Sequence, residues 1–136
     1  MSIPININDI SKKIKDNFSE IPFALIFGSQ VNGKTTEYSD IDIAIWYNGN
    51  DVLIKIKVLE VLDTLILNKS FDIVNINAAD PLLAHEALAG KVLFVRENQK
   101  SNYADFYTKI AAEYEDRIFW IKKQLQYRGY EVQWSN

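Results

Sequence analysis

The segment that decides the fold reads FALIFGS at residues 23–29 and is followed, ten residues later, by DIDIAIW at residues 40–46. The first part is a short continuous apolar run that ends at a Gly-Ser pair, which is typical of a buried strand that meets a tight turn. The second part begins with strict alternation of polar and apolar residues, which predicts a strand with Asp40 and Asp42 on one face. The segment therefore predicts two strands, with two carboxylates on the second.

Helical and strand-like segments alternate on both sides of this segment. The expected elements are a first helix that either Asn6 or Asn8 caps, strands over 23–27 and 40–46, a helix over about 51–68, a strand over 71–76, a helix over 80–89, a strand over 91–95 and a helix over about 102–127. Asp80 and Pro81 are typical of a helix start, with Asp as the cap and Pro at the first helical position. This order predicts an α/β domain (α+β, two layers) with a mixed sheet of four or five strands packed with helices.

Composition restricts the chemistry that is available to the chain. It has 136 residues, 48% of them hydrophobic, with no Cys, one His and a formal net charge of −3. This size predicts a single domain over residues 1–136 that holds its core without a disulfide or a structural zinc. The missing Cys excludes thiol catalysis, and the acidic balance speaks against direct nucleic-acid binding. No signal peptide or membrane-spanning segment is recognisable, so we expect a cytoplasmic protein.

Three carboxylates stand out because they interrupt apolar strands. Asp40 and Asp42 lie about 7 Å apart at the backbone and project to the same side, so that they repel each other by about 2 kcal/mol. Asp72 interrupts a further apolar strand, where a buried charge is costly without a partner. A divalent cation would neutralise the charge of all three carboxylates, and Mg²⁺ in particular is held by carboxylates together with phosphates. The alternative is that each Asp caps or flanks a strand in solvent.

The Gly-Ser pair at 28–29 has the properties of a phosphate cradle. Gly28 lets the backbone approach a phosphate, and Ser29 supplies a hydroxyl and is suited to open a short helix that Gly33 closes. The N-terminus of such a helix offers free amide groups and the positive end of the helix dipole. Ser39 either caps the entry into the next strand or binds a phosphate or a metal-bound water. Lys34 is more typical of a solvated turn than of a phosphate contact.

The GS pair at 28–29, ten intervening residues and DID at 40–42 form a Gly-Ser, ten residues, Asp-x-Asp motif. With this motif the sequence resembles the minimal nucleotidyltransferase (MNT) family of the DNA polymerase β superfamily. The resemblance covers most of the chain, including Asp72 in a following strand and the helix-to-strand passage that ends at residues 90–93. It implies a polymerase-β-type nucleotidyltransferase fold.

The resemblance implies an enzyme that transfers AMP from ATP to an acceptor hydroxyl with the help of two Mg²⁺ ions. Its catalytic and metal-binding residues would be Asp40, Asp42 and Asp72, of which Asp72 would also orient or deprotonate the hydroxyl. Its nucleotide-binding residues would be Gly28, Ser29 and Ser39. Small members of the family are often antitoxins encoded beside a HEPN protein, and this implies that the acceptor is a tyrosine of a ribonuclease toxin that adenylylation silences.

One position departs from the family pattern. The family commonly carries Arg before the glycine of the short loop, where this chain has Asn32 before Gly33. The loss of a cation near the phosphates would weaken triphosphate binding or change the choice of acceptor, with Lys34 as a substitute. All three carboxylates remain, so we still expect an active enzyme.

The C-terminal segment, residues 102–136, is unusually aromatic. Nine of the 17 aromatic residues lie there: Tyr103, Phe106, Tyr107, Tyr114, Phe119, Trp120, Tyr127, Tyr130 and Trp134. The inward stripe of the helix is expected to be Tyr103, Phe106, Ile110, Tyr114, Arg117, Ile121 and Leu125. Since one stripe cannot bury all the aromatic rings, we expect a protein interface here. The resemblance implies that its partner is the HEPN toxin. The alternative is that the tail folds back over the domain's own sheet.

Two other functions are compatible with the residues. Nucleotidyl transfer to a small molecule such as an aminoglycoside uses the same carboxylates, although the chain lacks a further domain to build a substrate pocket. Neutralisation of a toxin by binding alone needs the aromatic tail and no carboxylate. The single histidine, His85, lies within a predicted helix, where a structural role is more typical than a catalytic one.

Overall fold

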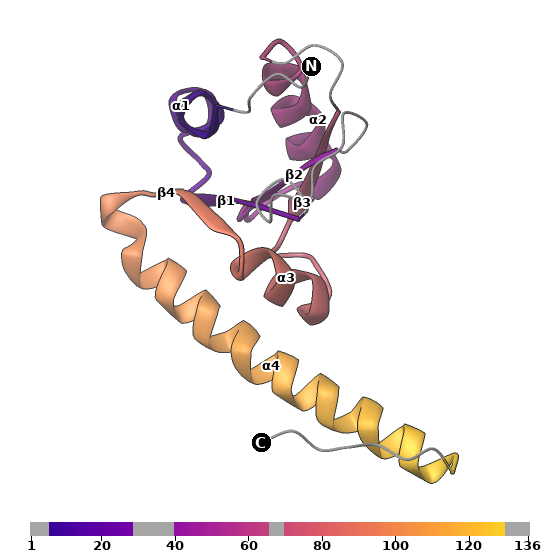
Figure 1. The fold of residues 1–136 in the computed structure, drawn as a ribbon. Coiled ribbons are helices and arrows are strands. Elements are labelled where there is room, and N and C mark those ends of the chain that lie inside the picture. The colour runs from indigo at the N-terminus through magenta and orange to yellow at the C-terminus, as the bar shows by residue number, and fades with distance from the viewer. Residues whose placement is uncertain (1–5, 29–39, 66–69, 130–136) are drawn as a thin grey trace.

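The computed structural model describes residues 6–28, 40–65 and 70–129 (Figure 1). In chain order the elements are α1 (Ile7–Asn17), β1 (Phe23–Phe27), β2 (Ile41–Ile45), α2 (Asp51–Leu62), β3 (Phe71–Asn75), α3 (Pro81–Leu88), β4 (Lys91–Val95), the 3₁₀ turn η1 (Glu97–Gln99) and α4 (Lys100–Tyr127). Helices and strands occur in the predicted order, and the α/β fold class is confirmed. No described helix has the length and apolarity needed to cross a membrane.

Side chains at the helix starts explain where three of the helices begin. The carboxamide oxygen of Asn6 accepts hydrogen bonds from the backbone amides of Asn8 and Asp9, so Asn6 is the cap of α1. Asp80 caps α3 through the amide of Leu82, with Pro at the first helical position as expected. Asn50 caps α2 in the same way. These short polar side chains satisfy amides that would otherwise lack a partner.

The second helix ends earlier than the sequence pattern predicts. It was expected to extend to about residue 68, whereas α2 ends at Leu62 and residues 63–65 form a turn. The hydroxyl of Thr64 donates to the carbonyl of Val61 at 3.0 Å. A Thr hydroxyl that competes for a backbone carbonyl in this way disfavours continuation of the helix.

The described sheet has four strands in the order β3-β2-β1-β4 (Figure 1). β1 is antiparallel to both β2 and β4, whereas β2 and β3 are parallel, so the sheet is mixed as predicted. The register sets Phe27 opposite Asp42 and Asp42 opposite Asp72. Residues that are far apart in the sequence are therefore neighbours at one edge of the sheet, where β1 ends and β2 and β3 begin.

Helices cover both faces of the sheet, so the domain has three layers where two were predicted, and each face has its own apolar core. On one face α1 and α2 pack against the side chains that include Ile26 and Ile43. On the other face α3 and α4 pack against the alternate residues of the strands, including Leu25, Phe27 and Ala44. The continuous apolar run of β1 follows from this arrangement, because a central strand that is covered on both faces has no solvent-facing side.

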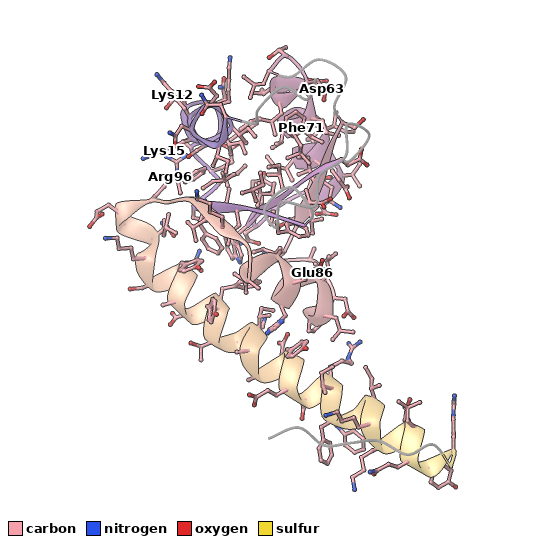
Figure 2. All side chains as sticks on the ribbon, in the orientation of Figure 1. Lys12, Lys15, Asp63, Phe71, Glu86 and Arg96 are labelled. Carbon is pink, nitrogen blue, oxygen red and sulfur yellow. The ribbon has the colours of Figure 1, made fainter. Side chains whose placement is uncertain are left out.

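Arg96 fastens the end of α1 to the end of β4. Its guanidinium donates hydrogen bonds to the carbonyls of Lys15 at 2.9 Å, Phe18 at 2.7 Å and Ile21 at 2.9 Å. It also lies over the ring of Phe94, 5.3 Å from the centroid. Figure 2 shows Lys15 and Arg96 close together at this corner. The Arg96 guanidinium thus donates to carbonyls that have no hydrogen-bond partner within the helix where α1 ends.

The C-terminal helix packs on the body from its start only as far as Arg117. α4 has 28 residues, which gives it a length of about 42 Å, and its far end extends past α3 (Figure 1). Phe106 and Ile110 are buried, as the predicted stripe requires. The prediction is wrong for Ile121 and Leu125, which continue the stripe but are exposed. They are exposed because α3 and the sheet do not reach that part of the helix.

Candidate active site

The carboxylates lie at the edge of the sheet where β1 ends. Asp42 is the second residue of β2, Asp72 is the second residue of β3, and the two are register neighbours in parallel strands. Side chains at such positions project from the same face, with the strands about 4.8 Å apart. Asp40 directly precedes β2 and is exposed, as is Asp72, whereas Asp42 is half-buried. The structure thus brings together Asp42 and Asp72, with Asp40 two residues away from Asp42.

The face that carries these carboxylates is the one covered by α3 and α4. Asp42 pairs with Phe27 and alternates with Ala44, and both of these residues belong to the core beneath α3 and α4. Residues two apart on a strand share a face. Asp42 therefore stands at the outer rim of this core, which explains its partial burial.

The electrostatic environment of Asp42 disfavours its negative charge. Burial is the main cause that raises the pKa of its carboxyl above the ordinary value of 3.8, and the charges of Asp72, Asp40 and Glu86 raise it further, in that order. A site that concentrates like charges around a half-buried carboxylate is suited to bind a cation. Partial burial distinguishes Asp42 from a carboxylate that flanks a strand in solvent, whereas Asp40 and Asp72 are exposed.

The raised pKa of Asp42 predicts that this residue costs the protein stability at neutral pH. The folded state holds the Asp42 proton more tightly than the unfolded chain, so this residue's contribution to stability falls as pH rises through 3.8 and the raised pKa. We expect Asp42→Asn to increase the unfolding free energy by about 0.5–2 kcal/mol at pH 7 in the presence of EDTA. The gain shrinks as pH is lowered toward about 4. Urea unfolding at the two pH values measures it, with Asp105→Asn as the control, and a loss of stability in Asp42→Asn would contradict it.

Gly28 brings the backbone of the turn against Asp42. It has a positive φ of 84°, and a Cβ built on it would collide with Oδ2 of Asp42. Only glycine adopts this conformation readily and leaves the space that the carboxylate occupies. The backbone at Gly28 therefore lies close to the carboxylate of Asp42, and its approach to a phosphate stays a prediction. The other residues predicted for this turn, Ser29, Asn32, Gly33, Lys34 and Ser39, lie outside the described residues.

The donor set fits a hard divalent cation by its chemistry. Carboxylate oxygens are the ligands that Mg²⁺ prefers, and the repulsion around Asp42 is what such an ion would relieve. Within residues 6–28, 40–65 and 70–129, no three His, Cys, Asp or Glu side chains are gathered closely enough to hold a metal ion together. The described carboxylates therefore have the chemistry of Mg²⁺ ligands and lie at one edge of the sheet, but their side chains do not form a complete coordination shell.

Two further polar residues, His85 on α3 and Asp80 at its N-cap, contact side chains of α4. The ring of His85 stacks on Tyr114, with centroids 3.6 Å apart and the planes inclined by 9°. Asp80 accepts a hydrogen bond from Arg117 at 3.0 Å. Both contacts hold α3 against α4, so His85 has the structural position that the sequence favours.

Glu86 belongs near the site, although the sequence analysis did not single it out. It lies on α3 (Figure 2) and is exposed. Its negative charge is among the causes that raise the pKa of Asp42. The only sequence signal is its position one helical turn before Gly90, at the end of the helix that returns the chain to the sheet. That signal is too general to identify a functional residue.

Two cavities between described residues lie away from the carboxylates. A cavity of about 360 Å³ lies beside α1, lined by residues that include Lys12, Asp16 and Leu65. Another, of about 310 Å³, is lined by residues that include Trp46 and Arg96, at the opposite end of the strands. Neither includes Asp40, Asp42 or Asp72 in its lining, so neither is a substrate pocket for these residues.

Comparison with solved structures shows the same fold in toxin–antitoxin complexes. One, a toxin–antitoxin with AMP-PNP, is 23% identical, with 90% of this chain and 94% of that chain covered and a TM-score of 0.70. A variant of a MntA toxin–antitoxin complex is 25% identical over 90% and 93% of the two chains, with a TM-score of 0.68. A third contains a tri-AMPylated Shewanella oneidensis HEPN toxin with an MNT antitoxin, at 22% identity, 88% and 89% coverage and a TM-score of 0.63.

Sequence comparison identifies one protein family for this chain. A search of curated proteins gives no significant match. The family model described as Polymerase beta, Nucleotidyltransferase matches residues 8–100, which is more than half of the chain and includes all four strands, the turn at Gly28 and the three carboxylates. The chain belongs to this nucleotidyltransferase family.

Proposed function

We propose that the chain transfers AMP from ATP to a tyrosine hydroxyl of a HEPN-type ribonuclease toxin and so acts as the antitoxin. The observation that carries the proposal is the register of β2 and β3, which sets Asp42 beside Asp72 at the edge where β1 ends and Gly28 follows. Family membership supports nucleotidyl transfer. A neighbouring structure pairs an MNT antitoxin with an AMPylated HEPN toxin, which supports this class of acceptor.

In the proposed site Asp40, Asp42 and Asp72 hold two Mg²⁺ ions. When bound, these ions offset the charge that develops on the transferred phosphoryl group and on the leaving pyrophosphate. Gly28, Ser29 and Ser39 bind the phosphates of ATP and hold the α-phosphorus in line with the acceptor oxygen. Asp72, on the strand at the edge of the sheet, orients the acceptor hydroxyl. Attack forms the new O–P bond as the bond to pyrophosphate breaks.

The far half of α4 supplies the surface on which we propose that the toxin binds. Phe119, Trp120 and Tyr127, in the second half of α4, are 43%, 59% and 94% exposed. Large aromatic side chains in this state are typical of protein interfaces. The exposure of these three rings favours an interface over the alternative that the tail folds back over the domain's own sheet. Tyr130 and Trp134 lie outside the described residues.

We further propose that the chain works in the cytoplasm as one nucleotidyltransferase domain over residues 1–136, with residues 102–136 as its C-terminal helix and tail. The α4 aromatic rings Tyr103 and Phe106 pack against Phe23, with centroids 5.1 and 6.2 Å away. This contact supports a single domain, because it makes the start of α4 part of the same core as β1.

Incubation with labelled ATP, Mg²⁺ and the protein encoded beside this chain tests the proposal. We expect label on a tyrosine of that protein and loss of its ribonuclease activity. Asp42→Ala is expected to remove the label, and removal of Mg²⁺ with EDTA is expected to do the same. No label with the wild-type chain, or undiminished label with Asp42→Ala, would show that the proposal is wrong.

The exposed rings of α4 also favour a second function, neutralisation of the toxin by binding alone. The two functions are separated by cell protection assays with two variants. A chain with Asp40→Asn and Asp42→Asn retains protection only if binding suffices. A chain truncated after Tyr127 loses protection if the tail carries the binding.

A further inference from the structure

We infer that one face of α4 pairs with the same face of a second copy of this chain, in antiparallel orientation about a twofold axis, when no toxin is bound. This face, called the pairing face below, consists of six residues: Ala112, Asp116, Phe119, Trp120, Lys123 and Tyr127. The pairing follows from the described helix alone. That the toxin later displaces the second copy rests on the proposed function, which gives the same aromatic rings to the toxin.

The pairing face lies on the side of α4 that is turned away from the body. All six of its residues are exposed. Successive residues of a helix are about 100° apart, so the six fall within an arc of about 100°. The residues of α4 that pack on the body are centred roughly 130° away, and they are Tyr103, Phe106, Ile110 and Tyr114. A second helix can therefore lie against the pairing face without meeting the body.

The order of side chains along this face is its own complement in the antiparallel direction. Along the chain it runs small, acidic, aromatic, aromatic, basic, aromatic. A twofold axis between Phe119 and Trp120 places these two rings opposite each other in the two copies. The same axis sets Asp116 level with Lys123 of the second copy, because the two residues are equally distant from it along the helix.

Charge determines the direction in which the two helices pair. In the antiparallel arrangement Asp116 of each copy faces Lys123 of the other, so that two ion pairs flank the central rings. In a parallel arrangement Asp116 would face Asp116 and Lys123 would face Lys123. Facing like charges disfavour that orientation, as they do between the helices of coiled coils.

The neighbouring charges of α4 have partners within the described part of the same chain. Glu113 pairs with Lys109 at 3.9 Å, and Arg117 pairs with Asp80 at 3.0 Å. These contacts leave Asp116 and Lys123 as the charges of opposite sign that the pairing face presents.

Aromatic rings supply the apolar part of the contact. The rings of Phe119 and Trp120 are in an edge-to-face arrangement, with centroids 5.7 Å apart. The ammonium group of Lys123 lies 5.6 Å from the centroid of the Phe119 ring. The axis that pairs these groups also sets the ring of Tyr127 against Ala112 of the second copy, where a methyl group leaves room for it. Aromatic side chains are enriched in protein interfaces.

The size of the contact makes the pair weak. From residue 112 to residue 127 the helix is about 22 Å long, and two helices that touch over this length bury less than the roughly 800 Å² per partner of a stable complex. We expect a dissociation constant of about 10–100 µM. A toxin that covers the same rings with a larger surface therefore displaces the second copy.

Sedimentation equilibrium of the full chain alone, without toxin or nucleotide, tests the pairing. We expect the average mass to rise above 15.7 kDa toward the dimer as the concentration is raised to about 500 µM. Asp116→Lys and Lys123→Asp should each weaken association at least about tenfold, because each creates two facing pairs of like charge. An equimolar mixture of the two variants should associate as the wild type does, since all its facing charges are opposite.

Asp63→Lys is the matched control, because it makes the same change of net charge at an exposed carboxylate beside α2. It should associate as the wild type does, and circular dichroism should show the same helix content in all variants. A wild type that stays monomeric, single variants that associate as the wild type does, or a mixture no more associated than its components overturns the pairing.

The proposed function is tested separately, by label on the toxin. A chain that pairs but leaves the toxin unlabelled overturns the proposed acceptor and retains the pairing. A toxin complex in which two copies of the chain remain joined through the pairing face overturns the displacement.

Discussion

Replacement of Asp42 by asparagine is expected to lower the rate of nucleotidyl transfer at least about a thousandfold, which corresponds to about 4 kcal/mol of lost transition-state stabilisation. Asp42 is the carboxylate on which the site converges, because it faces Asp72 across the strand pair and contacts the turn at Gly28. Asparagine keeps the shape of the side chain but removes the charge that the proposed Mg²⁺ ions need. The loss is therefore chemical rather than structural.

The transfer assay with labelled ATP measures this loss, and two controls define it. Asp105→Asn changes an exposed carboxylate of α4 and should leave the rate unchanged. Urea unfolding of Asp42→Asn should show a fold at least as stable as the wild type. An Asp42→Asn variant that transfers AMP within tenfold of the wild-type rate would contradict the placement of the site.

Truncation of Phe23 to alanine is expected to lower the unfolding free energy by about 3–5 kcal/mol. Phe23 is fully buried at the start of β1. Its ring lies 6.1 Å from that of Trp46 and 5.1 Å from that of Tyr103, the latter in an edge-to-face arrangement. Alanine leaves a cavity between the sheet and α4, and it removes the contacts that dock the start of the helix.

Urea unfolding followed by circular dichroism measures the change. Phe119→Ala is the matched control, since it removes the same side chain from the exposed half of α4 and should cost less than about 1 kcal/mol. Equal destabilisation by the two variants would mean that α4 is not docked through Phe23. Because domains of this size are stable by only about 5–15 kcal/mol, Phe23→Ala is expected to remove a large fraction of the total stability.

Local patterns were sufficient to predict the elements around the motif. The apolar run at residues 23–27 predicted a strand, and Asp80 with Pro81 predicted a helix start. Both elements occur as predicted. The neighbourhood of Asp42 and Asp72 could not be derived from the pattern alone. It depends on the strand order, which places β2 between β1 and β3, and single-sequence periodicity carries no information about that order.

Residues whose hydrogen-bond partners lie far away in the sequence could not be predicted for the same reason. Arg96 bonds to carbonyls 75 to 81 residues earlier in the chain. Asn75 is the buried polar residue of the described core, and its amide group exchanges hydrogen bonds with the backbone of Tyr47 at 3.0 Å. Neither residue interrupts a pattern or belongs to a motif. Their roles become visible only when the partners are next to them in space.

The stripe of α4 shows the opposite error. Periodicity predicts which face of a helix is apolar, but it does not show how far the supporting surface extends. Phe106 and Ile121 satisfy the same spacing, and only Phe106 is covered. From the spacing alone, Ile121 would be assigned to the core, although it is exposed in the structure.

The strand order β3-β2-β1-β4 also sets the order in which the protein can assemble during translation. β1, β2 and β3, with the carboxylates on β2 and β3, are complete once residue 75 has been made, but β1 then still has one open edge. That edge closes only when β4 has left the ribosome, and α4 follows last. Nascent chains that stop before β4 expose an apolar central strand as a free edge, which is a template for aggregation.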